Sequence, residues 1–285
     1  MRGVPLSIVS FNVRYPNSRD GANAWPNRKD IAVRALQDMA PDVFGLQEAY
    51  YEQILYIHQH MPDYAWFGRD RYGVHTNEHM AIFYDTTKLR LDEQGDFWLS
   101  DTPDVPMSMT WGNSLPRMAT WGLFTCLSGG KRFYVLNTHL HHTADADNIR
   151  SRSADLIAER VSALSPHVPV ILIGDLNTSD LSEAYRILTN PVADLFRDTR
   201  SIAATLSGPS ATYHGFRGVG INRIDYILVR GAVTVKEYTV NTFNEDGRYP
   251  SDHFPVWVRL ELAEQGQEQQ DTEVRSKKAQ AVETV

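Results

Sequence analysis

The chain has 285 residues, of which 42% are hydrophobic, and its formal net charge at pH 7 is −7. This length and apolar content can fill one large core, and the acidic balance argues against a protein that binds long nucleic acid through a broad basic surface. The single cysteine, Cys126, excludes an intrachain disulfide and a thiolate zinc cluster. No apolar run is long enough for a membrane span and no signal peptide is visible, so we expect a cytoplasmic protein.

The first half of the chain alternates predicted strands with predicted helices. The run Leu6–Val13 is typical of a buried strand, and the apolar spacing in Arg28–Ala40 predicts a helix. A second strand is predicted in Pro41–Ala49, and a second helix over Tyr50–Met61. Four strand-like runs then follow, at residues 79–85, 89–100, 117–127 and 131–140.

The second half begins with the clearest helical pattern, over Ala146–Leu164. An apolar strand at Val168–Asn177 and a short helix at Ser182–Leu188 come next, and three strands are predicted at residues 223–231, 233–240 and 254–262. This order, with no linker, predicts one α/β domain over residues 1–263. Residues 264–285 are polar and rich in Gln and Glu, so we predict a disordered tail there.

Polar side chains gather where the predicted strands begin or end. Each has an ordinary explanation when taken alone: Asn12 suits a turn, and Glu48 suits the cap of a following helix. Asp225 fits this explanation least well, because an unpaired carboxylate within an apolar strand is costly to bury. In α/β folds, functional sites form at strand ends, so we interpret the whole set as one site. The set comprises Asn12, Glu48, His139, Asp175, Asn177, Asp225, Asp252 and His253.

The oxygen donors in this set indicate a divalent metal. Glu48, Asp175 and Asp252 offer carboxylates, and Asn12 offers a neutral oxygen. Such hard ligands favour Mg²⁺ or Mn²⁺ over zinc.

The histidines in the set indicate chemistry on an anion. His139 and His253 can bind an anionic substrate or move a proton near neutral pH, and Asp225 could orient His253. Carboxylates, a hard cation and imidazoles together suit the hydrolysis of a phosphate ester.

Six short motifs, in this order, resemble the endonuclease/exonuclease/phosphatase superfamily: FNVR, LQEA, NTHL, GDLN, RIDYILV and SDHFPV. The resemblance extends from about Leu6 to Leu262. It implies an α/β four-layer sandwich of the DNase I type, with two packed, mostly antiparallel β-sheets flanked by helices. It also implies a metal-dependent hydrolase that cleaves a phosphate ester by in-line attack of an activated water.

The resemblance also implies roles for the strand-end residues. Glu48 would bind the metal, with Asn12 beside it and Asp252 close to the same or a second metal position. His139 and Asn177 would hold phosphate oxygens.

Asp175 would position or deprotonate the attacking water. His253, oriented by Asp225, would act on the phosphate as a general acid or base, or as an electrostatic stabiliser. The division of proton transfer between Asp175 and His253 stays open. Since adjacent strand residues point to opposite faces, we expect the chain to bend near Pro250, so that His253 faces Asp225 while Asp252 faces Glu48 and Asp175.

One residue departs from part of the superfamily. Apurinic endonucleases carry an acidic residue two places after the asparagine of the first strand, where this chain has Arg14. The change removes a second metal ligand, adds a cation beside the phosphate and argues against repair of abasic DNA.

A second ring of residues is predicted to contact the substrate: Arg14, Arg28, Arg117, His141 and His214. The alternative for each arginine is a surface ion pair or stacking on an aromatic ring. The Trp- and Pro-containing run at residues 95–117 is expected to wall a compact pocket, which favours a small substrate or a chain end.

These observations predict a monomer that hydrolyses a small phosphorylated metabolite, sugar or lipid, or a nucleic acid end. A single-strand exonuclease or endonuclease, a glycan-active hydrolase and a binding protein without catalysis stay open as alternatives. A zinc site at His139–His142 and a nucleophilic Ser251 are less favoured, because neighbouring strand residues alternate faces and no nucleophile elbow is present.

Overall fold

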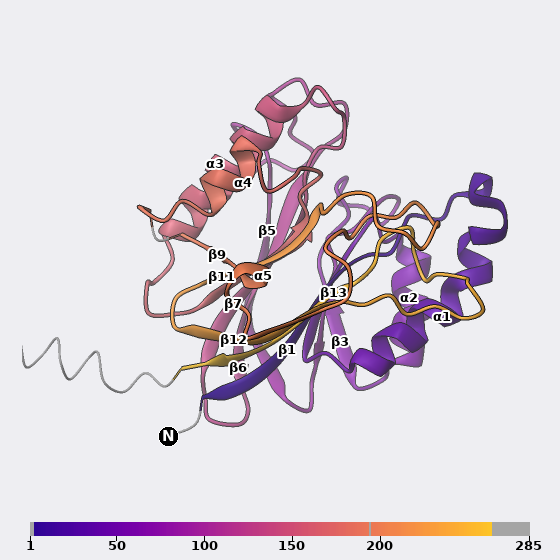
Figure 1. Cartoon of the computed structure of the whole chain (residues 1–285). Coiled ribbons are helices and arrows are strands. Elements are labelled where there is room, and N and C mark those ends of the chain that lie inside the picture. Colours follow the sequence, from indigo (N-terminus) through magenta and orange to yellow (C-terminus); the bar gives the residue numbers. More distant parts are fainter. Residues whose placement is uncertain (1–2, 194, 264–285) are drawn as a thin grey trace, which may run out of the picture.

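Two β-sheets pack face to face in the computed structural model, which describes residues 3–193 and 195–263 (Figure 1). The first sheet contains β1 (Val4–Asn12), β2 (Val43–Gln47), β3 (Tyr64–Phe67), β4 (Ile82–Asp85), β10 (Thr205–Ser207), β12 (Val233–Val240) and β13 (Val256–Leu262). Its strand order is β10-β12-β13-β1-β2-β4-β3.

The second sheet contains β5 (Leu89–Trp98), β6 (Met118–Cys126), β7 (Arg132–His139), β8 (Val170–Asp175), β9 (Arg197–Asp198) and β11 (Asp225–Arg230). Its order is β5-β6-β7-β8-β11-β9. The pairs β1–β2, β7–β8 and β10–β12 are parallel, and the other pairs are antiparallel. The prediction of mostly antiparallel sheets is therefore confirmed.

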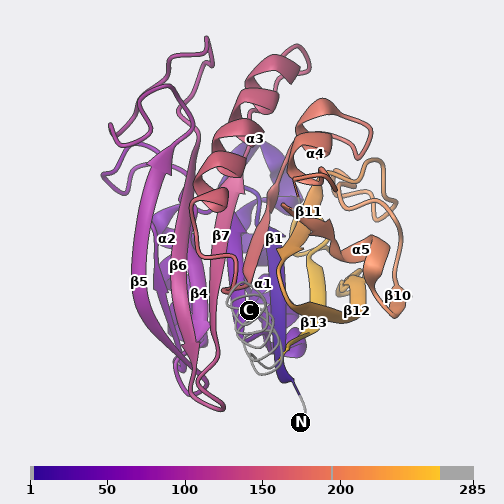
Figure 2. The same cartoon turned by 90° about the vertical axis from the view of Figure 1, so that its left-hand side faces the viewer.

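Helices cover both outer faces, as the two views at right angles show (Figures 1 and 2). The helices are η1 (Ser18–Asn23), α1 (Trp25–Met39), α2 (Tyr51–His60), α3 (Asp147–Ser162), α4 (Glu183–Leu188) and α5 (Thr199–Ile202). The first sheet carries α1 and α2, and the second carries α3 and α4. Helix α1 begins three residues before its predicted start because Pro26 fits the first turn, where its missing N–H leaves no bond unmade.

Three apolar layers hold the four structural layers together. Alternation along β1 sends Ile8 between the sheets, where it joins the cluster of Ile173, and sends Val9 outward to the cluster of Leu36 on α1. Leu172 of β8 faces the opposite way from Ile173 and packs in the cluster under α3 and α4. Each fully buried aliphatic side chain contributes about 1.5–3 kcal/mol, so the alternation of apolar residues specifies the sandwich.

The sheet registers bring the strand ends of the predicted site together. The parallel pair β1–β2 aligns Asn12 with Gln47, the residue before Glu48, and the parallel pair β7–β8 aligns His139 with Asp175. The antiparallel pair β8–β11 aligns Asp175 with Asp225. Because β1 lies against β8 and β11 of the other sheet, these ends meet at one edge of the sandwich.

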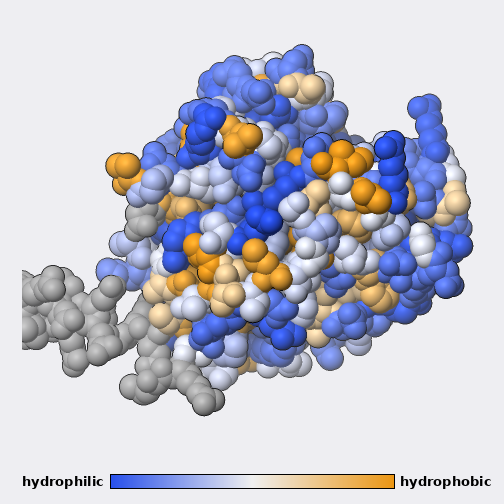
Figure 3. All heavy atoms as spheres, in the orientation of Figure 1, coloured by the Kyte–Doolittle hydropathy of each residue, from blue (hydrophilic) through white to orange (hydrophobic). Residues whose placement is uncertain are grey.

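Short elements were not predicted: η1, β3, β9, α5 and β10. The predicted tail at residues 264–285 lies outside the described residues. None of the described helices has the length and apolar content needed to cross a bilayer. The face seen in Figure 3 is mostly hydrophilic, with separate small hydrophobic patches.

Candidate active site

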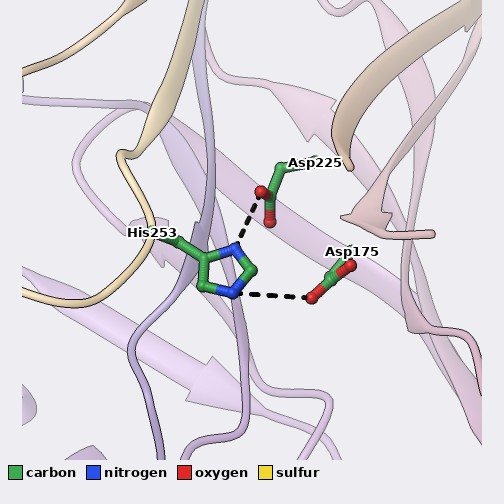
Figure 4. A group of neighbouring side chains, drawn as sticks. All are labelled: Asp175, Asp225 and His253. Carbon is green, nitrogen blue, oxygen red and sulfur yellow. Dashed lines mark hydrogen bonds and ion pairs between the residues drawn. The ribbon is translucent and has the colours of Figure 1, made fainter. Parts of the chain in front are cut away.

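His253 and Asp225 form a buried pair at the centre of the site (Figure 4). Asp225 begins β11, and His253 lies in the irregular segment just before β13. The imidazole Nδ1 lies 2.9 Å from Asp225 Oδ2, so Nδ1 carries the proton that it donates to the carboxylate. Burial lowers the pKa of His253, but the charge and hydrogen bond of Asp225 outweigh it and raise the pKa to about 10. The expected pairing of His253 with Asp225 is thus present.

Asp175 lies where several of the predicted residues converge. Its Oδ2 accepts a hydrogen bond from Asn12 Nδ2 at 3.0 Å and lies 3.5 Å from His139 Nε2 and 4.0 Å from His253 Nε2. Its Oδ1 accepts the backbone N–H of Asn177 at 2.8 Å. Burial, together with the charge of Asp225, raises the pKa of Asp175 above the ordinary range of a carboxylate. A buried carboxylate with a raised pKa can exchange protons close to neutral pH.

Asp175, Asp225 and His253 have the spacing of a metal site. Each offers one ligand atom, and these atoms all lie within 4.8 Å of one another. Carboxylate oxygens with one imidazole suit several divalent cations.

A second set of oxygen donors adjoins this group. Asn12 Nδ2 also donates to Glu48 Oε1 at 3.2 Å, so Glu48 and Asp175 flank the same amide. Burial raises the pKa of Asp252, and the nearby charge of Glu48 adds to the effect. Asn12 and Glu48, two of the three predicted metal ligands, therefore lie beside Asp175, and the carboxylate of the third, Asp252, lies 3.8 Å from Arg14 Nε.

The backbone is strained at three positions of the site. Arg14, Glu48 and Asn177 have φ angles of 57°, 59° and 49°, in the left-handed region that favours glycine. Each costs on the order of 1–2 kcal/mol, which the surrounding fold must offset. Bonds fix two of them: the Arg14 N–H donates to Asn12 Oδ1, and Asn177 Nδ2 donates to the Leu140 carbonyl. Strained backbone conformations of this kind cluster at functional sites, where side chains must be held in one orientation.

Glu78 is a site residue that the sequence did not reveal. Its Oε2 lies 3.8 Å from His139 Nδ1 and 3.8 Å from Arg117 Nη1, and its Oε1 accepts a 2.7 Å bond from Arg71 Nη2. Burial raises the pKa of Glu78, while burial and the charge of Arg117 lower the pKa of His139 well below its usual value. Glu78 and Arg71 belong to the loop before β4, and the one available signal was a glutamate directly preceding the predicted strand at residue 79.

Arg117 reaches the site but is only partly bonded. Its side chain is buried, and Nη2 lies 3.2 Å from His142 Nδ1. Since arginine only donates, His142 Nδ1 accepts, and its Nε2 carries the proton. Within the described part of the chain, Arg117 Nε and Nη1 have no hydrogen-bond partner. The run at residues 95–117 meets α3 through the pairs Asp101–Arg152 and Asp104–Arg160, and its role as the wall of a pocket stays a prediction.

Arg28 is a structural residue, so the prediction that it binds substrate was wrong. Its side chain is 0% exposed and donates to four backbone carbonyls, those of Val13, Arg14, Asn23 and Pro250, at 2.6–2.8 Å. The guanidinium therefore ties the segment after β1 to the segment that carries Asp252 and His253. It leaves no open face for a ligand.

His214 is packed inside the turn, and its predicted contact with substrate stays a prediction. Its ring is 0% exposed, stacks on Phe254 at 3.9 Å between centroids, and accepts the Gly218 N–H at Nδ1. The backbone N–H of His214 donates to the Asp252 carbonyl, so His214 also holds the turn that carries Asp252.

The two less favoured alternatives find no support in the geometry. Ser251 is buried and donates to the Asn12 carbonyl at 2.6 Å, so its hydroxyl is already engaged. Among the described residues, the group with metal-site spacing does not include His141 or His142. His141 is buried beside His142, and its carbonyl accepts a bond from Arg150. Its contact with substrate stays a prediction.

Comparison with known proteins agrees with this geometry. Residues 9–253 match the Endonuclease/Exonuclease/phosphatase family. A solved structure of a protein of this family from Bacteroides thetaiotaomicron shares 33% identity, with a TM-score of 0.87 over 93% of this chain and 100% of that chain. A mannosyl-6-phosphatase from the same organism shares 33% identity, with a TM-score of 0.83 over 90% of this chain and 99% of that chain.

A curated relative, an uncharacterized protein of Acanthamoeba polyphaga mimivirus, is 30% identical over 61% of this chain and 68% of its own length. The family match covers most of the chain, and the solved structures share its two-sheet sandwich with flanking helices. The chain therefore belongs to the endonuclease/exonuclease/phosphatase family and is a phosphoesterase with the DNase I-like fold.

Proposed function

We propose that this protein is a divalent-cation-dependent phosphomonoesterase acting on small phosphorylated sugars or related metabolites. The observation that carries the proposal is the convergence of His139, His253 and Asn12 on the buried carboxylate of Asp175. The similarity to a mannosyl-6-phosphatase over nearly the full length of both chains supports the choice of substrate class.

The cation site would be built from Glu48, Asn12 and Asp252, next to Asp175. When bound there, Mg²⁺ or Mn²⁺ would supply Lewis-acid stabilisation of the negative charge on the phosphate. The donor set fits such an ion, because its members are carboxylate and amide oxygens.

Asp175 and His253 divide the proton work in this proposal. Asp175, with its raised pKa, accepts a proton from the attacking water. His253 keeps Nδ1–H on Asp225 and turns Nε2 toward the reacting phosphate, where its positive charge stabilises the transition state. His139 and Asn177 hold the non-bridging oxygens.

Two features beside His253 suit a small polar alcohol as the leaving group. Tyr213 meets the His253 ring edge-on at 5.0 Å between centroids and is half-buried, so one part of its ring can pack against a sugar. The exposed His142, whose Nδ1 is held by Arg117, offers its Nε2–H to a hydroxyl or phosphate oxygen. Arg14 lies at the edge of the site and can meet a phosphate oxygen.

A substrate panel tests the proposal. Hexose 6-phosphates, p-nitrophenyl phosphate, bis-p-nitrophenyl phosphate and single-stranded oligonucleotides are assayed with Mg²⁺, with Mn²⁺ and with EDTA. We expect the monoesters to be hydrolysed fastest, EDTA to abolish turnover, and Asp175→Asn to lower kcat about 10³-fold. Asp155 provides the matched control, since Asp155→Asn removes the same charge from an exposed position on α3.

Two results would overturn the proposal. Oligonucleotides cleaved much faster than any monoester would identify a nuclease instead. A lack of turnover of every phosphate ester under all metal conditions would exclude phosphoesterase action on these classes and leave the glycan-active and binding alternatives.

A further inference from the structure

The paired residues Asp225 and His253 lie on separate segments of the chain (Figure 4) and come from different sheets. Asp225 begins β11 of the second sheet, and His253 lies just before β13 of the first sheet. Strand β11 pairs with β8 and β9, whereas β13 pairs with β1 and β12. Direct pairing of β11 with β13 therefore does not fix the 2.9 Å distance between the imidazole and the carboxylate.

Residues 212–214, here called the brace, are bonded to the start of β11. The Thr212 N–H donates to the Asn222 carbonyl at 2.9 Å. The Thr212 hydroxyl oxygen accepts two further backbone bonds at 3.1 Å, one from the N–H of Ile224 and one from that of Asp225. The side chain of Thr212 thus holds the backbone of Asp225 itself.

The brace is also bonded to the segment that carries His253. The Phe254 N–H donates to the Thr212 carbonyl at 2.7 Å, and the His214 N–H donates to the Asp252 carbonyl at 2.9 Å. These two bonds lie on either side of His253 along the chain. The brace therefore holds both members of the pair, although each belongs to a different sheet.

The hydroxyl of Thr212 is the part of the brace that depends on the type of residue. Almost any residue would supply the same backbone N–H and carbonyl, but the N–H groups of Ile224 and Asp225 need an acceptor oxygen on the side chain. Thr212 is 0% exposed, so water does not reach this position from outside. Loss of the hydroxyl would leave two buried N–H groups without an acceptor, and the start of β11 would shift to find one.

We propose that Thr212 is a positioning residue for phosphate ester hydrolysis. Its hydroxyl fixes Asp225 and its carbonyl fixes the segment of His253, so that the imidazole meets the carboxylate in the geometry that the reaction needs. Because Thr212 is fully buried, it acts through these two residues and not on the substrate. The inference rests on the proposed function for the role of His253, but the bond between His253 and Asp225 is measured without substrate.

The test compares Thr212→Val with Thr212→Ser, using the phosphate ester that the wild type hydrolyses fastest. Valine has the shape of threonine and the same stiff, branched side chain but lacks the oxygen, whereas serine keeps the oxygen. We expect Thr212→Val to lower kcat about 10- to 100-fold and to change KM less than about twofold, because a misplaced imidazole stabilises the transition state less. In Thr212→Ser, kcat should stay within about threefold of the wild type.

A second readout needs no substrate. The proton that His253 Nδ1 donates to Asp225 should give a downfield resonance in the proton NMR spectrum of the free protein, assigned by its absence from His253→Asn. The resonance should move upfield or broaden in Thr212→Val and keep its position in Thr212→Ser.

Thr199→Val is the matched control, because Thr199 is also 0% exposed and its hydroxyl donates to the Ile227 carbonyl of the same strand at 2.6 Å. This variant should lose stability in urea unfolding, as Thr212→Val does, but keep the kcat and the resonance of the wild type. A kcat in Thr212→Val equal to that in Thr199→Val, or a loss in Thr212→Ser as large as in Thr212→Val, would overturn the inference. If Thr212→Val does not fold, Thr212→Cys, whose sulfur is only a weak acceptor, replaces it under the same criterion.

The positioning role and the proposed function can fail separately. If the wild type hydrolyses no phosphate ester, the proposed function is rejected, and the resonance alone decides whether Thr212 positions the pair. An unchanged resonance and an unchanged kcat in Thr212→Val, on a chain that hydrolyses phosphate esters, would reject only the role given to Thr212.

Discussion

Arg28 and Arg117 are both buried arginines beside the same site, yet their hydrogen bonding differs. Arg28 donates to four backbone carbonyls. Arg117, 4% exposed, makes one hydrogen bond, to His142, and leaves Nε and Nη1 without a partner among the described residues. Burial lowers the pKa of both guanidinium groups, and it lowers that of Arg28 to about 10.

The difference separates two kinds of buried charge. A guanidinium whose donors are satisfied by backbone oxygens fixes the chain, and its removal leaves those oxygens unpaired. A guanidinium with unmade hydrogen bonds carries a cost that the fold tolerates at places where a ligand completes the bonding. Arg28 is therefore expected to matter for stability, and Arg117 for activity.

The largest effect is expected from Arg28→Met. The substitution leaves four carbonyls without their donor and releases the Pro250 segment from the segment after β1, so the free energy of unfolding should fall by about 3 kcal/mol or more. Urea unfolding followed by circular dichroism measures this. Arg28→Lys keeps the charge but can reach fewer carbonyls, so its free energy of unfolding should lie between those of the wild type and Arg28→Met. A free energy of unfolding equal to that of the wild type in Arg28→Met would contradict the structural role given to Arg28.

Arg117→Met is expected to have a smaller effect on stability and to act mainly on kcat/KM. An apolar side chain of similar length removes the unmade bonds, while Arg71 still pairs with Glu78, so the free energy of unfolding should fall by less than in Arg28→Met. At the same time kcat/KM for a hexose phosphate should fall about 10- to 100-fold. A large loss of stability with unchanged kcat/KM would show that Arg117, like Arg28, is structural.

The smallest effect is expected in the rate at which the Cys126 thiol is labelled, which reports how often the fold opens in each arginine variant. The thiol is buried between the sheets, and burial raises its pKa to about 11, so it should react slowly with Ellman's reagent at pH 8. We expect the same slow rate in Arg117→Met and a faster rate in Arg28→Met, which opens more often. Rapid labelling of the wild-type chain would contradict the buried position of Cys126.

Much of the fold was predictable because it follows from local patterns. Alternation along β1 and the apolar run of β8 identified strands with defined inner faces, and the helical spacing identified α1 and α3. The missed elements, such as β9 and β10, are two and three residues long. Segments this short have no period of their own, and neighbouring strands select their conformation.

The candidate site likewise contains residues that the sequence identified and residues whose roles only the structure distinguishes. Asp175, Asp225 and His253 could be found because carboxylates and imidazoles at the ends of apolar strands are costly unless they are used together. Arg28, Arg117 and His214 were grouped as substrate contacts because their sequence contexts looked alike. The structure separates them by their hydrogen bonds and packing.

The sequence by itself determined most strands and helices and the polar residues at the strand ends, since burial patterns and residue chemistry act over a few neighbouring positions. Its six motifs indicated the family and, through that resemblance, the layered fold. Only the tertiary structure decided which charged groups were satisfied. Arg28 meets the Pro250 carbonyl across 222 positions of the chain, and Asn12 meets Asp175 across 163. Glu78 likewise became part of the site only when its loop packed against His139 and Arg117. Such contacts have no local signature, because hydrogen bonding depends on distance in space rather than on separation along the chain.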